Sequence, residues 1–305
     1  MKLTIDFAFA GAEIIRKHPM AVLSWGVAYL VLSVVTTILT VVLGGEALAT
    51  LMSYNQNPPS DPLAVFEPMG ALAPIWAISC VLSLLVGAII QCAVYRSQLQ
   101  PQASGLGFMQ LGGAEIRQIF VTILWILAII VFYILFGIVI GILLAVSGAV
   151  SQSSSLAGGL MTFFTIGFAI VAFLYILSRW SLVAIQSFAE GRINIFGSFA
   201  LTKGNGWILF GGYALLTIIA LLVVSLIYAI LAAVTMGTGG DIVTAFSQMQ
   251  RPDLSSVQAL FTPAYIVQTL VGAVLSGVFY ALFYGASVAA YQALSAKKVD
   301  ASAVF

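Results

Sequence analysis

The stretch Ile119–Val146 reads IFVTILWILAIIVFYILFGIVIGILLAV and contains no charged residue, no histidine and no proline. A helix needs about 20 consecutive apolar residues to cross the hydrocarbon core of a bilayer. This run exceeds that length, lacks the alternation of a barrel strand, and is far longer than the roughly ten residues such a strand needs. It therefore predicts a transmembrane helix that tilts or emerges into the interface.

Five further runs are equally free of charge and long enough, or nearly long enough, to cross a bilayer. With the first, the expected spans are 20–43, 75–95, 119–146, 160–177, 207–234 and 265–290. Hydrophobic residues make up 62% of the 305 residues and charged residues 7%. Soluble domains carry roughly 25% charged residues, so the composition excludes a water-soluble protein. The predicted fold class is all-α, a polytopic integral membrane protein with six transmembrane helices and amphipathic interfacial helices, forming a single membrane domain over residues 1–305.

The charged residues outside these runs are divided unequally between the two sides of the membrane. Ten of the 11 lysines and arginines lie in the N-terminal segment 1–19, the loops 96–118 and 178–206, and the tail 291–305. The opposite loops, which are 44–74, 147–159 and 235–264, hold only Arg251. The positive-inside rule places the basic side in the cytoplasm, so we expect both termini there. A formal net charge of +1 also argues against a nucleic-acid partner.

The segment from Leu3 to Lys17 has the pattern of an amphipathic helix. Its apolar residues recur at helical spacing, with Phe7 and Ile14 on one face and Glu13 and Lys17 on the other. Pro19 then separates this segment from the first span. Two interpretations remain open: a helix lying in the interface with basic residues toward lipid phosphates, or an ordinary cytoplasmic helix packed on the bundle.

A short motif recurs along the chain. Gly11-Ala12-Glu13-Ile14 precedes the first span, Gly113-Ala114-Glu115-Ile116 precedes the third, and 196–203 (FGSFALTK) precedes the fifth. Each is followed by, or ends in, a basic residue, and a pair of spans comes next. We interpret the chain as three repeats of a short interfacial helix plus a transmembrane hairpin.

Small residues at four-residue spacing allow helices to approach closely in a membrane. The third span offers Gly137, Gly141 and Ala145, and the sixth offers Ala281, Gly285 and Ala289. We expect these mainly as packing seams within the chain, with dimer contacts as the alternative.

Two adjacent stretches carry a resemblance to a known family. They are 188–192 (FAEGR) and 198–207 (SFALTKGNGW), the second having the form Ser-x-x-Leu-Thr-basic-Gly before an aromatic residue. They resemble the cytoplasmic segment of the bacterial six-span family named for the membrane domain of glycerophosphodiester phosphodiesterase. The resemblance implies six spans in a bacterial inner membrane. Some relatives carry a phosphodiesterase domain after the membrane part; this sequence departs from them by ending about fifteen residues after its last span, so no such activity is carried over.

The sequence contains few residues that are suited to catalysis. Acid–base or metal-assisted hydrolysis needs carboxylates and usually histidines, whereas no predicted span contains either and the sole histidine, His18, lies at an interface. Ion-coupled carriers place ionisable residues within spans, and none is found there. We therefore expect no enzyme, no cofactor, no catalytic residue and no metal site.

The expected function is a non-enzymatic membrane protein concerned with membrane organisation, lipid handling or partner binding. Its partner is the phospholipid bilayer; a protein partner or a homo-oligomer is left open. The candidate headgroup contacts are Arg16, Lys17, Arg117, Arg192 and Lys203. Two alternatives stand beside this expectation: that the basic residues only set the orientation, and that the protein is a permease for a lipid or another small molecule.

Overall fold

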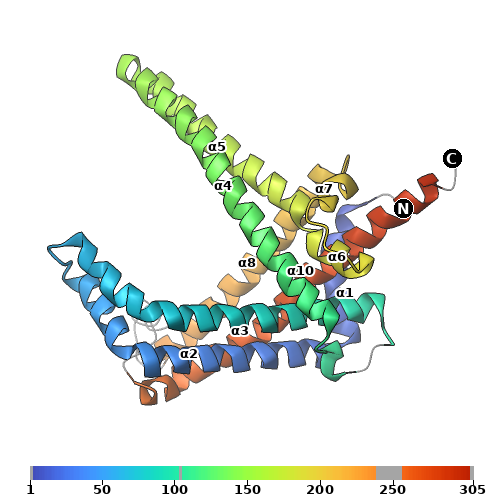
Figure 1. Ribbon diagram of the computed structural model, residues 1–305, viewed down its shortest axis with the longest axis horizontal. Coiled ribbons are helices and arrows are strands. Elements are labelled where there is room, and N and C mark those ends of the chain that lie inside the picture. Colours follow the sequence, from blue (N-terminus) through green and yellow to red (C-terminus); the bar gives the residue numbers. More distant parts are fainter. Residues whose placement is uncertain (1–2, 103–104, 238–255, 303–305) are drawn as a thin grey trace. The chain divides into compact units, whose positions relative to one another are not determined.

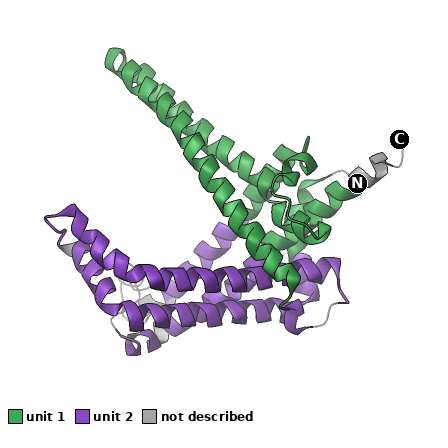
Figure 2. Ribbon diagram, in the orientation of Figure 1, with its two compact units in different colours: residues 1–11, 111–216, 283–305 green, residues 12–110, 217–282 purple. Residues whose placement is uncertain are grey.

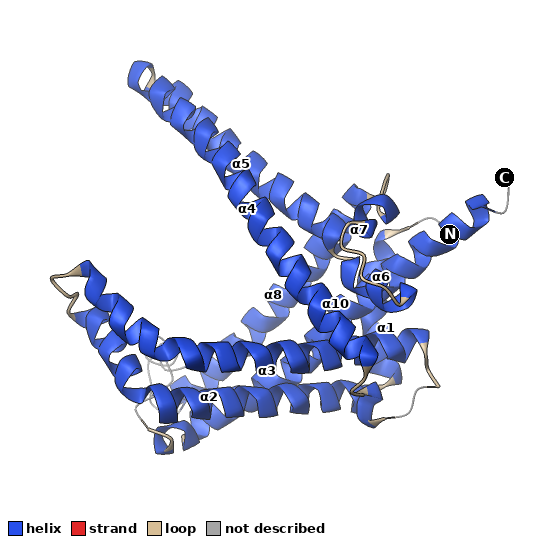
Figure 3. Cartoon of the chain, viewed as in Figure 1, coloured by secondary structure: helices blue, strands red, loops and turns tan. Residues whose placement is uncertain are grey.

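The computed structural model describes residues 3–102, 105–237 and 256–302. Within these ranges every regular element is a helix, and no strand occurs (Figure 3). The elements labelled in Figure 1, together with the short 3-10 helices, are η1 (Ile5–Phe9), α1 (Ala10–Lys17), α2 (Pro19–Gln56), η2 (Pro62–Val65), α3 (Phe66–Leu99), η3 (Leu106–Phe108), α4 (Gly113–Ser153), α5 (Ser155–Trp180), α6 (Val183–Glu190), α7 (Gly197–Leu201), α8 (Gly206–Gly237), η4 (Gln258–Phe261) and α10 (Pro263–Ser302).

Six of these helices are long and apolar enough to cross a membrane, namely α2, α3, α4, α5, α8 and α10. Each predicted apolar run lies within one of them. The prediction of an all-α polytopic membrane protein with six spanning helices is therefore confirmed.

The helices extend well beyond the apolar runs. The predicted loop 44–74 is helical except around residues 57–61, because α2 continues to Gln56 and η2 begins at Pro62. Adding a residue to an existing helix gains one hydrogen bond, and residues 46–52 are mostly strong helix formers. At the other end of the chain α10 continues to Ser302, so most of the expected tail 291–305 belongs to this helix.

The expected unit of a separate short helix before each hairpin is found only in part. Before α2, the helix α1 ends at Lys17, and Pro19 begins the next helix. Before α8 there are two short helices, α6 and α7. At Gly113–Ile116 the expectation of a separate helix is wrong, because these residues form the first turn of α4 itself. No proline follows them to interrupt the helix before the span.

The chain divides into two compact units, coloured separately in Figure 2. Unit 2 comprises residues 12–110 and 217–282 and contains the hairpin of α2 and α3. Its packing depends on glycine: a Cβ on Gly26 would lie 2.7 Å from the carbonyl oxygen of Ala273, and one on Gly277 would meet the carbonyl oxygen of Val22. The absence of side chains at these two positions lets α2 and α10 touch backbone to backbone.

Unit 1 comprises residues 1–11, 111–216 and 283–305 and contains the hairpin of α4 and α5. Val121, Trp180 and Val183 form a buried cluster that joins α4, the end of α5 and the start of α6. Within unit 1 the expected third-span seam makes no contact, since a Cβ on Gly137 or Gly141 would meet no described atom within 4 Å. In the sixth span, Ala281 and Gly285 are buried as expected.

Candidate functional site

An open groove of about 700 Å³ in unit 2 begins where α1 gives way to α2. One wall is the first three turns of α2, and the other is η3 with the residue that follows it. Lys17 and His18 lie at one end, and the rest of the lining is mainly apolar. The lining residues are Lys17, His18, Pro19, Met20, Ala21, Leu23, Ser24, Val27, Ala28, Leu106, Gly107, Phe108 and Met109.

The η3 wall is fastened by side chains from two different helices. Trp25 of α2, fully buried, donates a hydrogen bond from Nε1 to the carbonyl oxygen of Gly107 at 2.8 Å. Arg96 at the end of α3 is also buried and donates from Nη1 to the carbonyl oxygen of Phe108 at 3.3 Å. The neutral bond from Trp25 contributes about 0.5–1.5 kcal/mol and the bond from the charged Arg96 about 1.5–3 kcal/mol, so the two together hold the wall in position.

The backbone of this wall adopts an unusual conformation. Gly107 and Phe108 have φ angles of 59° and 61°, and Phe108 is the one non-glycine residue with positive φ in the described part of the chain. A left-handed conformation costs an ordinary residue roughly 1–2 kcal/mol. Gly107 also lies so close to α2 that a Cβ there would collide with the hydroxyl of Ser24. Such strain persists where surrounding contacts enforce it, and it is frequent at ligand clamps.

The polar end of the groove carries positive charge at the C-terminus of α1. The Nζ of Lys17 lies 2.7 Å from a carboxylate oxygen of Glu13, and the two side chains are 60% and 55% exposed. The hydrogen bond from Lys17, and then the attraction of its ammonium, lower the pKa of the Glu13 carboxyl. Arg16 is exposed beside this pair. The ring of His18 meets that of Phe108 edge to face at 5.3 Å, which brings the end of α1 into contact with the η3 wall.

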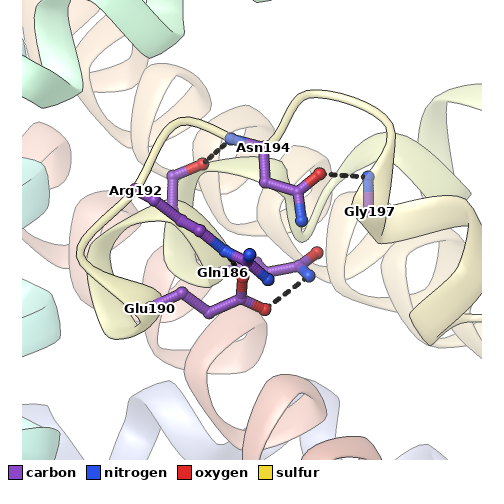
Figure 4. Close-up of polar contacts among 6 residues, drawn as sticks. Gln186, Glu190, Arg192, Asn194 and Gly197 are labelled. Atoms are coloured by element: carbon purple, nitrogen blue, oxygen red, sulfur yellow. Dashed lines mark hydrogen bonds and ion pairs between the residues drawn. The ribbon is translucent and has the colours of Figure 1, made fainter.

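A second basic segment lies in unit 1, between α6 and α7 (Figure 4). Glu190 accepts hydrogen bonds from Nε2 of Gln186 at 2.7 Å and from Nε of Arg192 at 2.8 Å. Asn194 donates its backbone N–H to Ser187 Oγ and accepts one from Gly197 through Oδ1. The loop is thereby folded onto α6, and Arg192 remains 71% exposed at its surface.

The Ser-x-x-Leu-Thr motif has a structural role that its sequence did not reveal. Ser198 and Thr202 are fully buried. Ser198 Oγ donates to the carbonyl oxygen of Arg179, and Arg179 Nε donates to Thr202 Oγ1 at 3.1 Å. The Arg179 guanidinium also lies over the ring of Phe199, 5.2 Å from its centre, and Nη2 donates to the Phe199 carbonyl oxygen. These contacts attach α7 to the end of α5.

The five expected headgroup contacts are divided between the two units and differ in exposure. Lys17 lines the groove and Arg16 is exposed next to it; Arg192 and Lys203 are exposed in unit 1, and Arg117 is only partly exposed on α4.

The sequence did not predict that two other arginines, Arg96 and Arg179, hold neighbouring segments in place through hydrogen bonds. Both directly or almost directly follow an apolar run, but Lys17 and Lys203 also lie close to apolar runs and are exposed, so this placement does not predict an inward orientation.

The described residues contain no group of three or more histidine, cysteine or acidic side chains placed to hold a metal ion. Searches of protein-family models, curated proteins and solved structures find no match to the chain.

Proposed function

We propose that this chain is a non-enzymatic protein of a bacterial inner membrane whose basic surfaces, on the cytoplasmic side, engage anionic phospholipid headgroups. The observation that carries the proposal is the position of Lys17, a cation at the mouth of a mainly apolar groove where α1 meets a spanning helix. Membrane organisation or lipid handling follows from such contacts. The resemblance to the six-span bacterial family is consistent with this role.

Electrostatics supports the proposal without requiring a specific pocket at each residue. A lysine or arginine close to an anionic membrane surface contributes about 1 kcal/mol of attraction. Arg16, Arg192 and Lys203 are exposed and belong to the side that holds ten of the 11 basic residues. The pair between Lys17 and Glu13 is exposed, so solvent screening keeps it weak and a lipid phosphate can compete for the ammonium.

The test compares the lipids that the protein retains when it is extracted from vesicles of equal phosphatidylglycerol and phosphatidylcholine content. Native mass spectrometry counts each bound lipid. We expect wild type to retain phosphatidylglycerol preferentially, and Arg16→Gln/Arg192→Gln/Lys203→Gln to lose about fivefold or more of that preference, as removal of at least 1 kcal/mol would give.

Arg251→Gln is the control, because it removes a basic residue from the opposite loops, and it should retain the wild-type lipid ratio. An unchanged preference in the triple variant would mean that these basic residues only orient the protein.

A second function, passage of a lipid through or along the protein, is favoured by another groove on the same helix. This groove of about 230 Å³ is almost entirely apolar and lies between the middle of α2, from Leu30 to Ile38, and the residues 260–270 of η4 and α10. A dithionite assay for lipid scrambling in proteoliposomes would detect such passage. Rates equal to those of protein-free vesicles would exclude it.

A further inference from the structure

We propose that the groove between α2 and η3 holds one anionic glycerophospholipid. Its phosphate would lie at Lys17 and His18, and one acyl chain would follow α2 past Met20, Leu23 and Val27. This inference rests on the proposed function and deepens it, because it assigns a single bound molecule to a defined place instead of a general attraction to the surface.

The length of the groove matches one leaflet. The lining runs along α2 from Pro19 to Ala28, and the nine steps between these two residues, at a rise of 1.5 Å each, span about 14 Å. Half of a hydrocarbon core of about 30 Å is about 15 Å. A lipid with its phosphate at the start of α2 would therefore lie beside the groove over the whole depth of its own leaflet.

The groove lining is charged at one end and apolar beyond it, as a phospholipid has a charged headgroup and apolar acyl chains. Lys17 at one end supplies three N–H donors and a positive charge. Beyond it, Met20, Leu23 and Val27 project from α2 and are all exposed, and Leu106 of η3 is exposed across the groove. Among the described residues of unit 2 no neighbour buries these side chains, and together they form a surface suited to an acyl chain.

The second wall is what distinguishes this groove from ordinary lipid-facing surface. Its position is enforced by the hydrogen bonds from Trp25 and Arg96 and by the close approach of Gly107 to Ser24. Because protein contacts alone hold the left-handed backbone at Phe108, the groove between this wall and α2 would be preformed for a lipid. Preorganisation of this kind reduces the entropy lost on binding.

Photocrosslinking tests the position of the acyl chain. The full-length protein is reconstituted in nanodiscs with phosphatidylglycerol that carries a diazirine on one acyl chain, and the labelled peptides are mapped. We expect labelling of the peptides that hold residues 20–28 and 106–109. Leu23→Trp fills the groove and should reduce this labelling about tenfold, which corresponds to about 1.4 kcal/mol.

The matched control is Val31→Trp, which adds the same side chain to another exposed position of α2 that does not line the groove. It should change the labelling of 20–28 and 106–109 less than twofold. Equal labelling in wild type and in both tryptophan variants would overturn the assignment of the chain to this groove.

Gly107→Ala tests the wall independently of the groove-filling residue. The added Cβ would collide with Ser24 and force η3 away from α2, so labelling at 106–109 should fall by a similar factor while far-UV circular dichroism remains that of wild type. Gly113→Ala is the control, because a Cβ there meets no described atom within 4 Å. Labelling that is unaffected by Gly107→Ala would contradict a preformed wall.

The headgroup is tested with Lys17→Gln and with a phosphatidylcholine probe that carries the same diazirine. Groove labelling by the anionic probe should fall about fivefold in Lys17→Gln, and wild type should show a similarly weaker signal with phosphatidylcholine. Equal labelling by the two lipids would overturn the anionic assignment.

The two proposals fail in different ways. If the Arg16→Gln/Arg192→Gln/Lys203→Gln variant loses its lipid preference but the groove peptides are never labelled, the groove proposal is wrong and the headgroup function stands. If the groove is labelled in a Lys17-dependent manner while the triple variant keeps its preference, the general surface attraction is wrong and the single site carries the lipid contact.

Discussion

The two copies of Gly-Ala-Glu-Ile in this chain have the same four residues and opposite buried faces. In the first copy Ile14 is 4% exposed, whereas the side chain of Glu13 is 55% exposed and pairs with Lys17. In the second copy Glu115 is 1% exposed and Ile116 is 59% exposed. An identical local sequence therefore presents its carboxylate to solvent in α1 and encloses it in α4.

The difference shows that these four residues do not by themselves set which side chain is buried. Buried apolar residues and exposed charges, as found in α1, are the arrangement typical of a helix beside water. In α4, a buried carboxylate and an exposed isoleucine are the arrangement expected beside lipid, where apolar side chains lie against acyl chains and polar ones turn toward the protein. Pro19 ends the first copy as a short helix, and the absence of a proline after the second lets it continue into the membrane.

The largest difference between the copies is expected for the isoleucines. Ile14→Ala should lower the free energy of unfolding by about 2–4 kcal/mol, because it removes buried methyl groups and leaves a cavity. Ile116→Ala should lower it by less than about 1 kcal/mol, since its side chain is mostly exposed. Unfolding of the purified protein in mixed micelles, followed by circular dichroism, measures both. An equal loss of unfolding free energy in the two variants would contradict the finding that the two copies bury opposite faces.

A somewhat smaller difference is expected for the glutamates. Glu115→Ala should destabilise the protein by about 2 kcal/mol, because the groups around the buried carboxylate lose a polar partner. Glu13→Ala should leave the unfolding midpoint of the same assay almost unchanged, since that carboxylate is solvated. A larger effect at Glu13 than at Glu115 would reverse the comparison.

The smallest effect concerns pH and is confined to the first copy. Lys17 lowers the pKa of Glu13 below its ordinary value, so the pair stabilises the fold above that value, about 4.3. The contribution is lost as the pH falls through the lowered pKa and Glu13 takes up a proton. Wild type should therefore lose slightly more thermal stability than Lys17→Gln between pH 6 and pH 3. Parallel pH profiles for the two proteins would argue against the pair in solution.

The sequence could predict only the part of the candidate site where a basic residue lies at the end of an apolar run. Lys17 was expected at a membrane contact because it precedes a span, and it lines the groove. The opposite wall could not be predicted, because residues 106–109 are held against α2 by contacts such as that of Trp25 with Gly107, which are 82 residues apart in the sequence. The sequence around Arg179 likewise does not distinguish it from an exposed arginine. Its inward direction depends on its hydrogen bonds with Ser198 and Thr202.

The sequence by itself determined that this is a helical membrane protein with six spans, because apolar length and the exclusion of charge are properties of consecutive residues. It also determined the unequal division of basic residues between the two sets of loops. Only the tertiary structure decided which face of each Gly-Ala-Glu-Ile copy is buried and that η3 closes a groove against α2. Burial depends on which other helix lies alongside, and a stretch of sequence carries no information on a neighbour that is many residues away.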